Sequence, residues 1–128
     1  MSFENYLLSH RTQNQYTIER NSRQHPTILE IYQKRVEMLD WTLDRYRTIQ
    51  QQEQQAHQNN QNQNDLLIII NRINEELYEK KKIARNNLEK SELRDETVIY
   101  RIEETTIKEI LSEIGDFIRS NKTYIKAL

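Results

Sequence analysis

The chain has 128 residues with 19 Lys and Arg, 20 Asp and Glu, one Gly, one Pro and no Cys, and its formal net charge is −1. This length suits a single domain, and the missing cysteines exclude disulfide scaffolds, thiolate zinc sites and a cysteine nucleophile. Leu, Ile, Val and Phe supply 32 residues, enough for a modest core, whereas a β-rich fold would need Gly and Pro in turns at short intervals. We therefore expect an all-α protein: a three- or four-helix antiparallel bundle, or an extended helical hairpin with coiled-coil-like packing.

The first predicted element is a weak helix over residues 1–25, whose apolar residues form two turns separated by polar residues. Pro26 then marks the clearest boundary in the chain, because a proline disfavours helical backbone at the preceding residue, His25. Thr27 and Glu30 have the spacing of a capping box, which predicts that the next helix begins here.

The second predicted helix, residues 27–57, carries apolar residues at alternating steps of three and four, the pattern of a coiled-coil interface. This seam consists of Leu29, Tyr32, Val36, Leu39, Leu43 and Tyr46. Trp41 points almost opposite the seam, so the helix has two apolar faces. Either this helix is central in the bundle and packs on both sides, or Trp41 is exposed and anchors a partner. The seam and Trp41 are the candidate interface residues.

Residues 58–64 are rich in Gln and Asn and predict a loop. The third predicted helix, residues 65–94, opens with the five consecutive apolar residues 66–70. Five such residues cover every side of a helix, so we expect at least two neighbouring helices to bury this turn.

Two interpretations of residues 65–114 stay open, because this stretch contains neither Gly nor Pro. Apolar residues recur there every eleven positions, which keeps them nearly in line on a straight helix. They are Leu66, Leu77, Leu88, Ile99 and Ile110. One long helix would present them as a single stripe. The alternative is a break within residues 85–97, with Asp95 capping a separate helix over residues 95–120, and we favour it because a compact domain buries more surface.

Arg20 and His25 are the one pair that suggests catalysis. Their Arg-x4-His spacing in a small all-α chain resembles the motif of the HEPN ribonucleases, helical-bundle dimers that cut RNA without a metal. The resemblance covers six residues and implies a catalytic role for this Arg and this His. The other interpretation of the same residues is a polar loop between two helices.

The only basic cluster consists of Arg72, Lys80, Lys81, Lys82 and Arg85. A nucleic-acid-binding patch would need these side chains on one face without nearby acids. Three glutamates lie within residues 75–79, and Glu76 can pair with Lys80 one helical turn away. Ion pairs on a solvated face are therefore the favoured interpretation, and nucleic-acid binding is the alternative.

The sequence shows no pattern typical of a metal site, a membrane span or a secretory signal. With three His, no Cys and no Glu-x-x-His pair, we expect no metal site and no cofactor. The longest apolar run has five residues, far short of a membrane span, and the first residues do not resemble a secretory signal. We expect a cytoplasmic protein without a membrane partner.

The sequence thus favours a non-enzymatic helical protein–protein interaction or assembly module: an adaptor, a structural subunit or a small inhibitor. Long helices with two apolar faces, on a chain too short to bury them all, predict self-association, and a symmetric homodimer is the expected state. A metal-independent ribonuclease and a weak nucleic-acid-binding protein are the alternatives.

Overall fold

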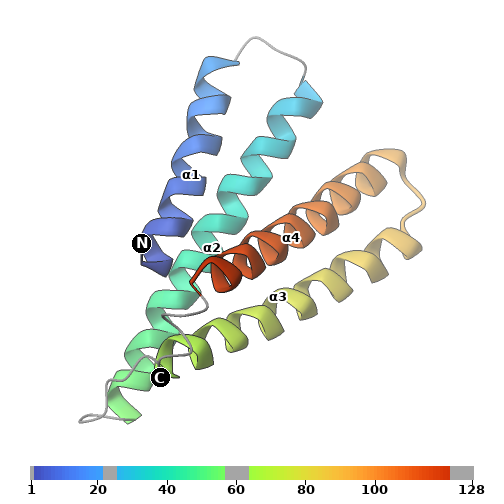
Figure 1. Ribbon diagram of the computed structural model, residues 1–128. Helices are drawn as coiled ribbons and strands as arrows, with labels where there is room; N and C mark the ends of the chain where they lie inside the picture. Colours follow the sequence, from blue (N-terminus) through green and yellow to red (C-terminus); the bar gives the residue numbers. More distant parts are fainter. Residues whose placement is uncertain (1, 22–25, 57–63, 122–128) are drawn as a thin grey trace.

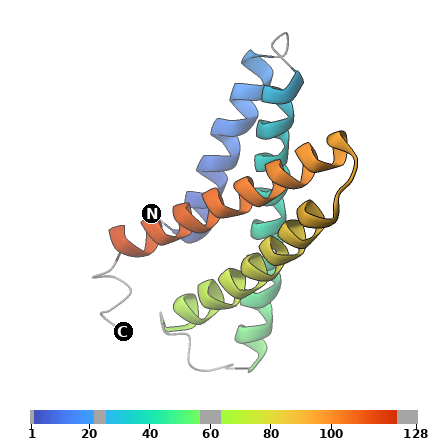
Figure 2. The same ribbon diagram turned by 90° about the vertical axis from the view of Figure 1, so that its right-hand side faces the viewer.

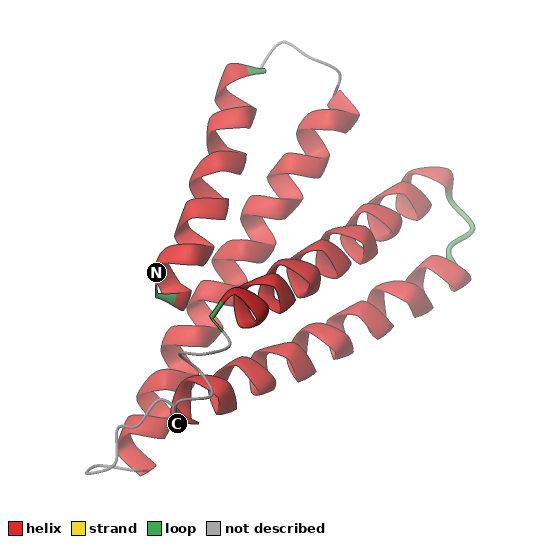
Figure 3. Cartoon of the chain, viewed as in Figure 1, coloured by secondary structure: helices red, strands yellow, loops and turns green. Residues whose placement is uncertain are grey.

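The computed structural model describes residues 2–21, 26–56 and 64–121, and these form four helices joined by short connections (Figure 3). The helices are α1 (Phe3–Arg20), α2 (Pro26–Ala56), α3 (Asn64–Lys90) and α4 (Arg94–Ser120). The described part of the chain contains no strand. The all-α expectation is confirmed. The predicted loop at residues 58–64 lies outside the described residues except for Asn64, which begins α3.

The four helices form two antiparallel hairpins, α1–α2 and α3–α4 (Figure 1). Helix α2 is central, because it packs against α1 on one side and against both α3 and α4 on another. Figure 2 shows the second hairpin crossing α2 obliquely. The hairpins meet near the start of α1 and the end of α4, and they diverge toward the opposite ends.

The bounds of α2 and the starts of α3 and α4 lie within one residue of the predicted ones, whereas α3 ends at Lys90 instead of residue 94 and α1 ends at Arg20 instead of residue 25. Helix α2 begins at Pro26, where the fixed φ angle and the missing N–H of proline suit the first helical position. The chain does break between α3 and α4, as we favoured. Asp95, however, does not cap α4: the cap is Leu93, which makes no side-chain capping hydrogen bond. Asp95 instead lies in the first turn, where its charge favours the helix N-terminus.

The turn between α3 and α4 reverses the chain, so the residues spaced by eleven are not one stripe. The Ser91 and Thr97 hydroxyls lie 2.9 Å apart across this turn, and both hydroxyls donate to the carbonyl oxygen of Leu93. Beyond it, Ile99 is 49 % exposed while Ile110 is buried. The single-helix alternative is therefore wrong, because the chain turns back between residues 88 and 99.

The core lies where the two hairpins cross. Its fully buried apolar side chains come from all four helices: Phe3 and Leu7, Leu39 and Ile49, Ile70, Ile73 and Leu77, and Ile107, Ile110 and Ile114. The apolar run at residues 66–70 is not buried on every side, since Ile68 is 43 % exposed. The expectation is therefore met only in part: α3 packs against both α2 and α4 and buries Ile69 and Ile70, but its outer side stays uncovered at Ile68.

An aromatic cluster closes the junction between the hairpins. The ring of Phe117 in α4 lies 5.2 Å from the rings of both Phe3 and Tyr6 in α1, and Phe3 lies 5.3 Å from Tyr46 in α2. These separations are typical of favourable ring contacts. The cluster therefore joins the first turn of one hairpin to the last turn of the other.

Candidate functional site

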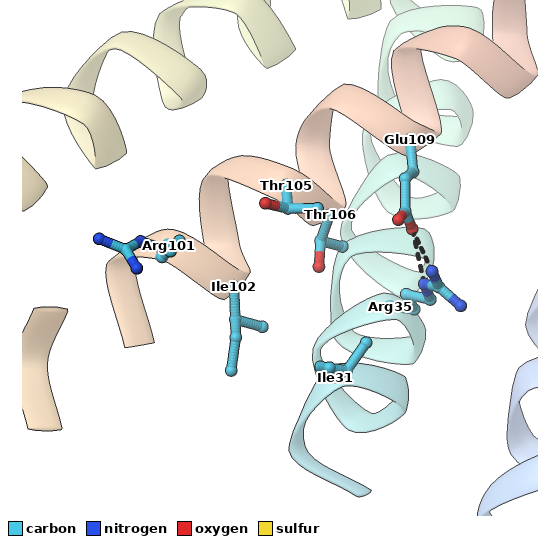
Figure 4. Close-up of a pocket in the computed structure, with 7 residues that line it drawn as sticks. All are labelled: Ile31, Arg35, Arg101, Ile102, Thr105, Thr106 and Glu109. Carbon is cyan, nitrogen blue, oxygen red and sulfur yellow. Dashed lines mark hydrogen bonds and ion pairs between the residues drawn. The ribbon is translucent and has the colours of Figure 1, made fainter. Parts of the chain in front are cut away.

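A cleft lies between α2 and α4, where the hairpins diverge. It consists of two adjoining pockets of about 200 and 220 Å³, and Ile102 lines both of them. We refer to both pockets together as the cleft. Its lining residues are Glu30, Ile31, Gln33, Lys34, Arg35 and Glu37 of α2, with Ile99, Arg101, Ile102, Thr105, Thr106 and Glu109 of α4. Figure 4 shows Ile31 and Ile102 pointing into the space between the two helices.

The apolar part of the cleft continues a face of α4 that is core further along. Residues 99, 102, 106 and 110 follow at steps of three and four and therefore share one side of the helix. Thr106 and Ile110 are buried where the hairpins cross, whereas Ile102 is half-buried and Ile99 is exposed. The same face is thus covered by α2 at one end and left uncovered where α2 diverges from it.

Six charged residues line the cleft, and four of them form ion pairs. Arg35 donates to Glu109 at 2.7 Å and thereby joins α2 to α4 (Figure 4). Lys34 pairs with Glu37 on α2 at 3.2 Å. The remaining two, Glu30 and Arg101, are exposed and have no ion-pair partner among the described residues. The cleft therefore carries one unpaired acid on α2 and one unpaired base on α4.

A polar cluster beside the cleft joins α1 to α4. The Tyr6 hydroxyl donates to the backbone carbonyl of Glu113 at 2.8 Å, and His10 Nδ1 lies 3.6 Å from Glu113 Oε1. The rings of Tyr6 and His10 are in edge contact at 4.6 Å. Together with the Arg35–Glu109 pair, these contacts link the two hairpins where they begin to diverge.

Burial raises the pKa of the Glu113 carboxyl. His10 on α1 and Arg35 on α2 oppose the rise in pKa, while Glu109 and Asp116 on α4 add to it. Burial also raises the pKa of the Tyr6 hydroxyl, with smaller contributions from Glu113 and Asp116. Because the folded chain favours protonated Glu113, this group stabilises the fold fully below its unfolded pKa and loses that contribution as the pH rises through the folded value.

Glu113→Gln should therefore raise the melting temperature at pH 7, and the difference from the native chain should shrink toward pH 4. The amide cannot ionise, so it avoids the cost of burying a charge. Thermal unfolding followed by circular dichroism across this pH range measures the effect, with Glu92→Gln in the exposed α3–α4 turn as the control. A lower melting temperature for Glu113→Gln at pH 7 would show that attraction to His10 and Arg35 outweighs burial.

The predicted interface seam divides into a buried and an accessible part. Val36, Leu39, Leu43 and Tyr46 are buried within the single chain. Leu29 and Tyr32, nearer the start of α2, stay partly exposed. The buried four belong to the core of the folded chain, where they are not accessible to another protein.

Trp41 packs against the core cluster and is half-buried. The ammonium group of Lys80 in α3 lies 4.5 Å from the centre of its ring, within the range of a cation–π contact. The structure thus favours the interpretation in which α2 is central and packs on both sides, over an exposed Trp41.

Of the two residues of the ribonuclease motif, only Arg20 lies among the residues that the structure describes. Arg20 is exposed at the end of α1, and His25 lies outside the described residues. Their catalytic role stays a prediction.

The basic cluster on α3 is largely occupied by contacts with neighbouring side chains. Arg72 pairs with Glu53 at 3.3 Å, and Arg85 pairs with Glu89 at 3.2 Å and Glu104 at 3.6 Å. Lys80 covers Trp41, and Lys81 lies 5.2 Å from the ring centre of Tyr78. Lys82 is exposed. These contacts point in different directions from α3, so they do not form one unpaired basic face.

Comparison with known proteins gives no relative. The chain matches no protein-family model, no curated protein and no solved structure. Within the described residues, no group of three or more His, Asp or Glu side chains could hold a metal ion. None of the helices in this part of the chain is long and apolar enough to cross a membrane.

Sequence reasoning missed the cleft. From the sequence, Ile31 could be placed near the second apolar face of α2. Ile99 and Ile102 could be recognised as part of the apolar pattern of α4. No local signal indicated that Glu30 and Arg101 would line the same cleft, because their proximity depends on how the two hairpins cross.

Proposed function

We propose that the protein is a non-enzymatic, cytoplasmic helical interaction module, acting as an adaptor, structural subunit or small inhibitor, and that the cleft is its binding face. Self-association is part of this proposal, as expected for a soluble chain with uncovered apolar helix faces. The seam first predicted to mediate it is replaced here by the cleft, because four of its six residues are core.

The observation that carries the proposal is the uncovered apolar surface at the diverging ends of the hairpins. The large apolar side chains that are more than a third exposed at these ends include Ile28, Leu93, Val98 and Ile99, of which Ile99 lines the cleft. Contiguous exposed apolar surface with a polar rim is typical of protein-binding sites. The charged residues Glu30, Lys34, Glu37 and Arg101 supply such a rim.

A helix is the ligand shape that this cleft suits best. Its walls are two helices, with Ile31 on α2 and Ile99 and Ile102 three positions apart on α4. A third amphipathic helix can pack its apolar face into a groove of this kind. The ion pairs Arg35–Glu109 and Lys34–Glu37 leave little unpaired charge in the lining, which favours a ligand of mixed polarity over a polyanion.

A photoreactive amino acid at position 99 tests the proposal in cells that naturally produce the chain. We expect a discrete protein adduct from position 99, because Ile99 lines the cleft. The matched control is position 78, since Tyr78 is 52 % exposed against 49 % for Ile99 and lies on α3 away from the cleft lining. Equal adducts from both positions, or none from either, would contradict the cleft as a binding face.

A further inference from the structure

The cleft carries a charge pattern that specifies its occupant. Glu30 on α2 and Arg101 on α4 flank the apolar residues Ile31, Ile99 and Ile102, and the other four charged lining residues are already paired. A ligand that satisfies both charges must bring a base to Glu30 and an acid to Arg101, on either side of an apolar strip.

We propose that the occupant of the cleft is a second copy of this chain, related to the first by a two-fold axis. In a two-fold interface, when residue i contacts residue j of the partner, residue j also contacts residue i of the partner. An axis through the cleft near Ile102 would place Arg101 of each copy against Glu30 of the other. The two unpaired charges of each chain would then form two ion pairs across the dimer.

The apolar residues fit the same arrangement. Ile99 and Ile102, near the axis, would pack against the same two residues of the second copy. The exposed Ile28 and Val98 would extend this contact along α2 and α4. Burial of such side chains supplies the main attraction, while the charge pairs fix the register. A formal net charge of −1 on each chain gives little general repulsion between two copies.

This inference rests on the proposed function, since it names the partner that the cleft binds. A polyanion would find both signs of charge in the cleft, and an unrelated acidic peptide would leave Glu30 unpaired. A second copy satisfies both residues with groups that are known to be present.

Charge reversal at the two positions tests the arrangement. Light scattering on a sizing column gives the molar mass of the full chain over a range of concentrations, and we expect the native chain to be a dimer. Glu30→Arg and Arg101→Glu should each weaken the dimer by about 10- to 100-fold, because each replaces two attractions with two repulsions. The double variant Glu30→Arg/Arg101→Glu should restore the native dissociation constant to within about threefold.

Two further variants separate the interface from the fold. Lys82→Glu reverses an exposed charge on α3, outside the cleft lining, and should leave the dimer unchanged. Ile99→Asp should weaken the dimer while the far-UV circular dichroism stays native, because Ile99 is 49 % exposed in the single chain.

Other outcomes overturn the inference in distinguishable ways. A dimer unaffected by either reversal would mean that copies associate through another face, and self-association would survive. A native chain that stays monomeric would exclude the second copy, and adducts from position 99 would then decide whether the cleft binds another protein. A monomer destabilised by each reversal and rescued by the double variant would show that Glu30 and Arg101 pair within one chain.

Discussion

Replacing Ile70 with aspartate is expected to abolish cooperative folding. The Ile70 side chain is fully buried in the core between the hairpins. A carboxylate there would lose its hydration without gaining a partner, which costs several kcal/mol, and the lost apolar contacts would cost about 2–5 kcal/mol more. This sum is comparable to the whole stability of a small domain, about 5–15 kcal/mol.

The matched control for this change lies two residues earlier on the same helix. Ile68 is 43 % exposed, so its aspartate can stay hydrated, and we expect Ile68→Asp to change the free energy of unfolding by about 1 kcal/mol or less. Urea unfolding monitored by far-UV circular dichroism compares the two variants. Similar losses at both positions would contradict the orientation of α3, as would a cooperative transition in Ile70→Asp.

Replacing Phe117 with alanine is expected to lower the free energy of unfolding by about 3–5 kcal/mol. Phe117 is 2 % exposed, and its ring contacts the rings of Phe3 and Tyr6 at the junction of the hairpins. Removing it leaves a cavity between the start of α1 and the end of α4, which the surrounding helices cannot fill without moving. Denaturant unfolding of the native and variant chains measures the loss.

A double-mutant cycle between Phe3 and Phe117 tests whether this ring contact acts directly. Phe3→Leu and Phe117→Leu keep an apolar side chain at each position but remove the ring pair. We expect a coupling free energy of about 0.5–1.5 kcal/mol. Strictly additive losses would mean that the two rings stabilise the fold independently, and the junction would then depend on the aliphatic core alone.

The helix boundaries could be predicted because their signals are local. Pro26 sets the start of α2 through its own backbone geometry, and the expected helix at 27–57 differs from the observed Pro26–Ala56 by one residue at each end. The start of α4 was predicted equally closely, but the predicted capping residue was wrong, since Leu93 and not Asp95 occupies the N-cap position. Periodicity and turn chemistry act over a few residues, so they are readable without the fold.

The neighbours of each apolar face could not be predicted in the same way. Periodicity identified the seam from Leu29 to Tyr46 correctly as apolar, but a seam packed within the chain and a seam that binds a second chain have the same pattern. Ile99 and Ile110 illustrate the same limit: both continue one apolar spacing, yet one is exposed and the other buried. Which residues are covered depends on where α2 and α4 cross.

The sequence by itself determined that this protein is helical and that α2 has two apolar faces, and it favoured a break before α4 without deciding it. Only the tertiary structure decided that the hairpins diverge and leave a cleft between them. Contacts between the hairpins join residues far apart in the chain: Arg35 and Glu109 are 74 positions apart, and Tyr6 and Glu113 are 107 apart. Such pairs form only when separate helices meet at one angle, and side-chain chemistry along one segment carries no information about that angle.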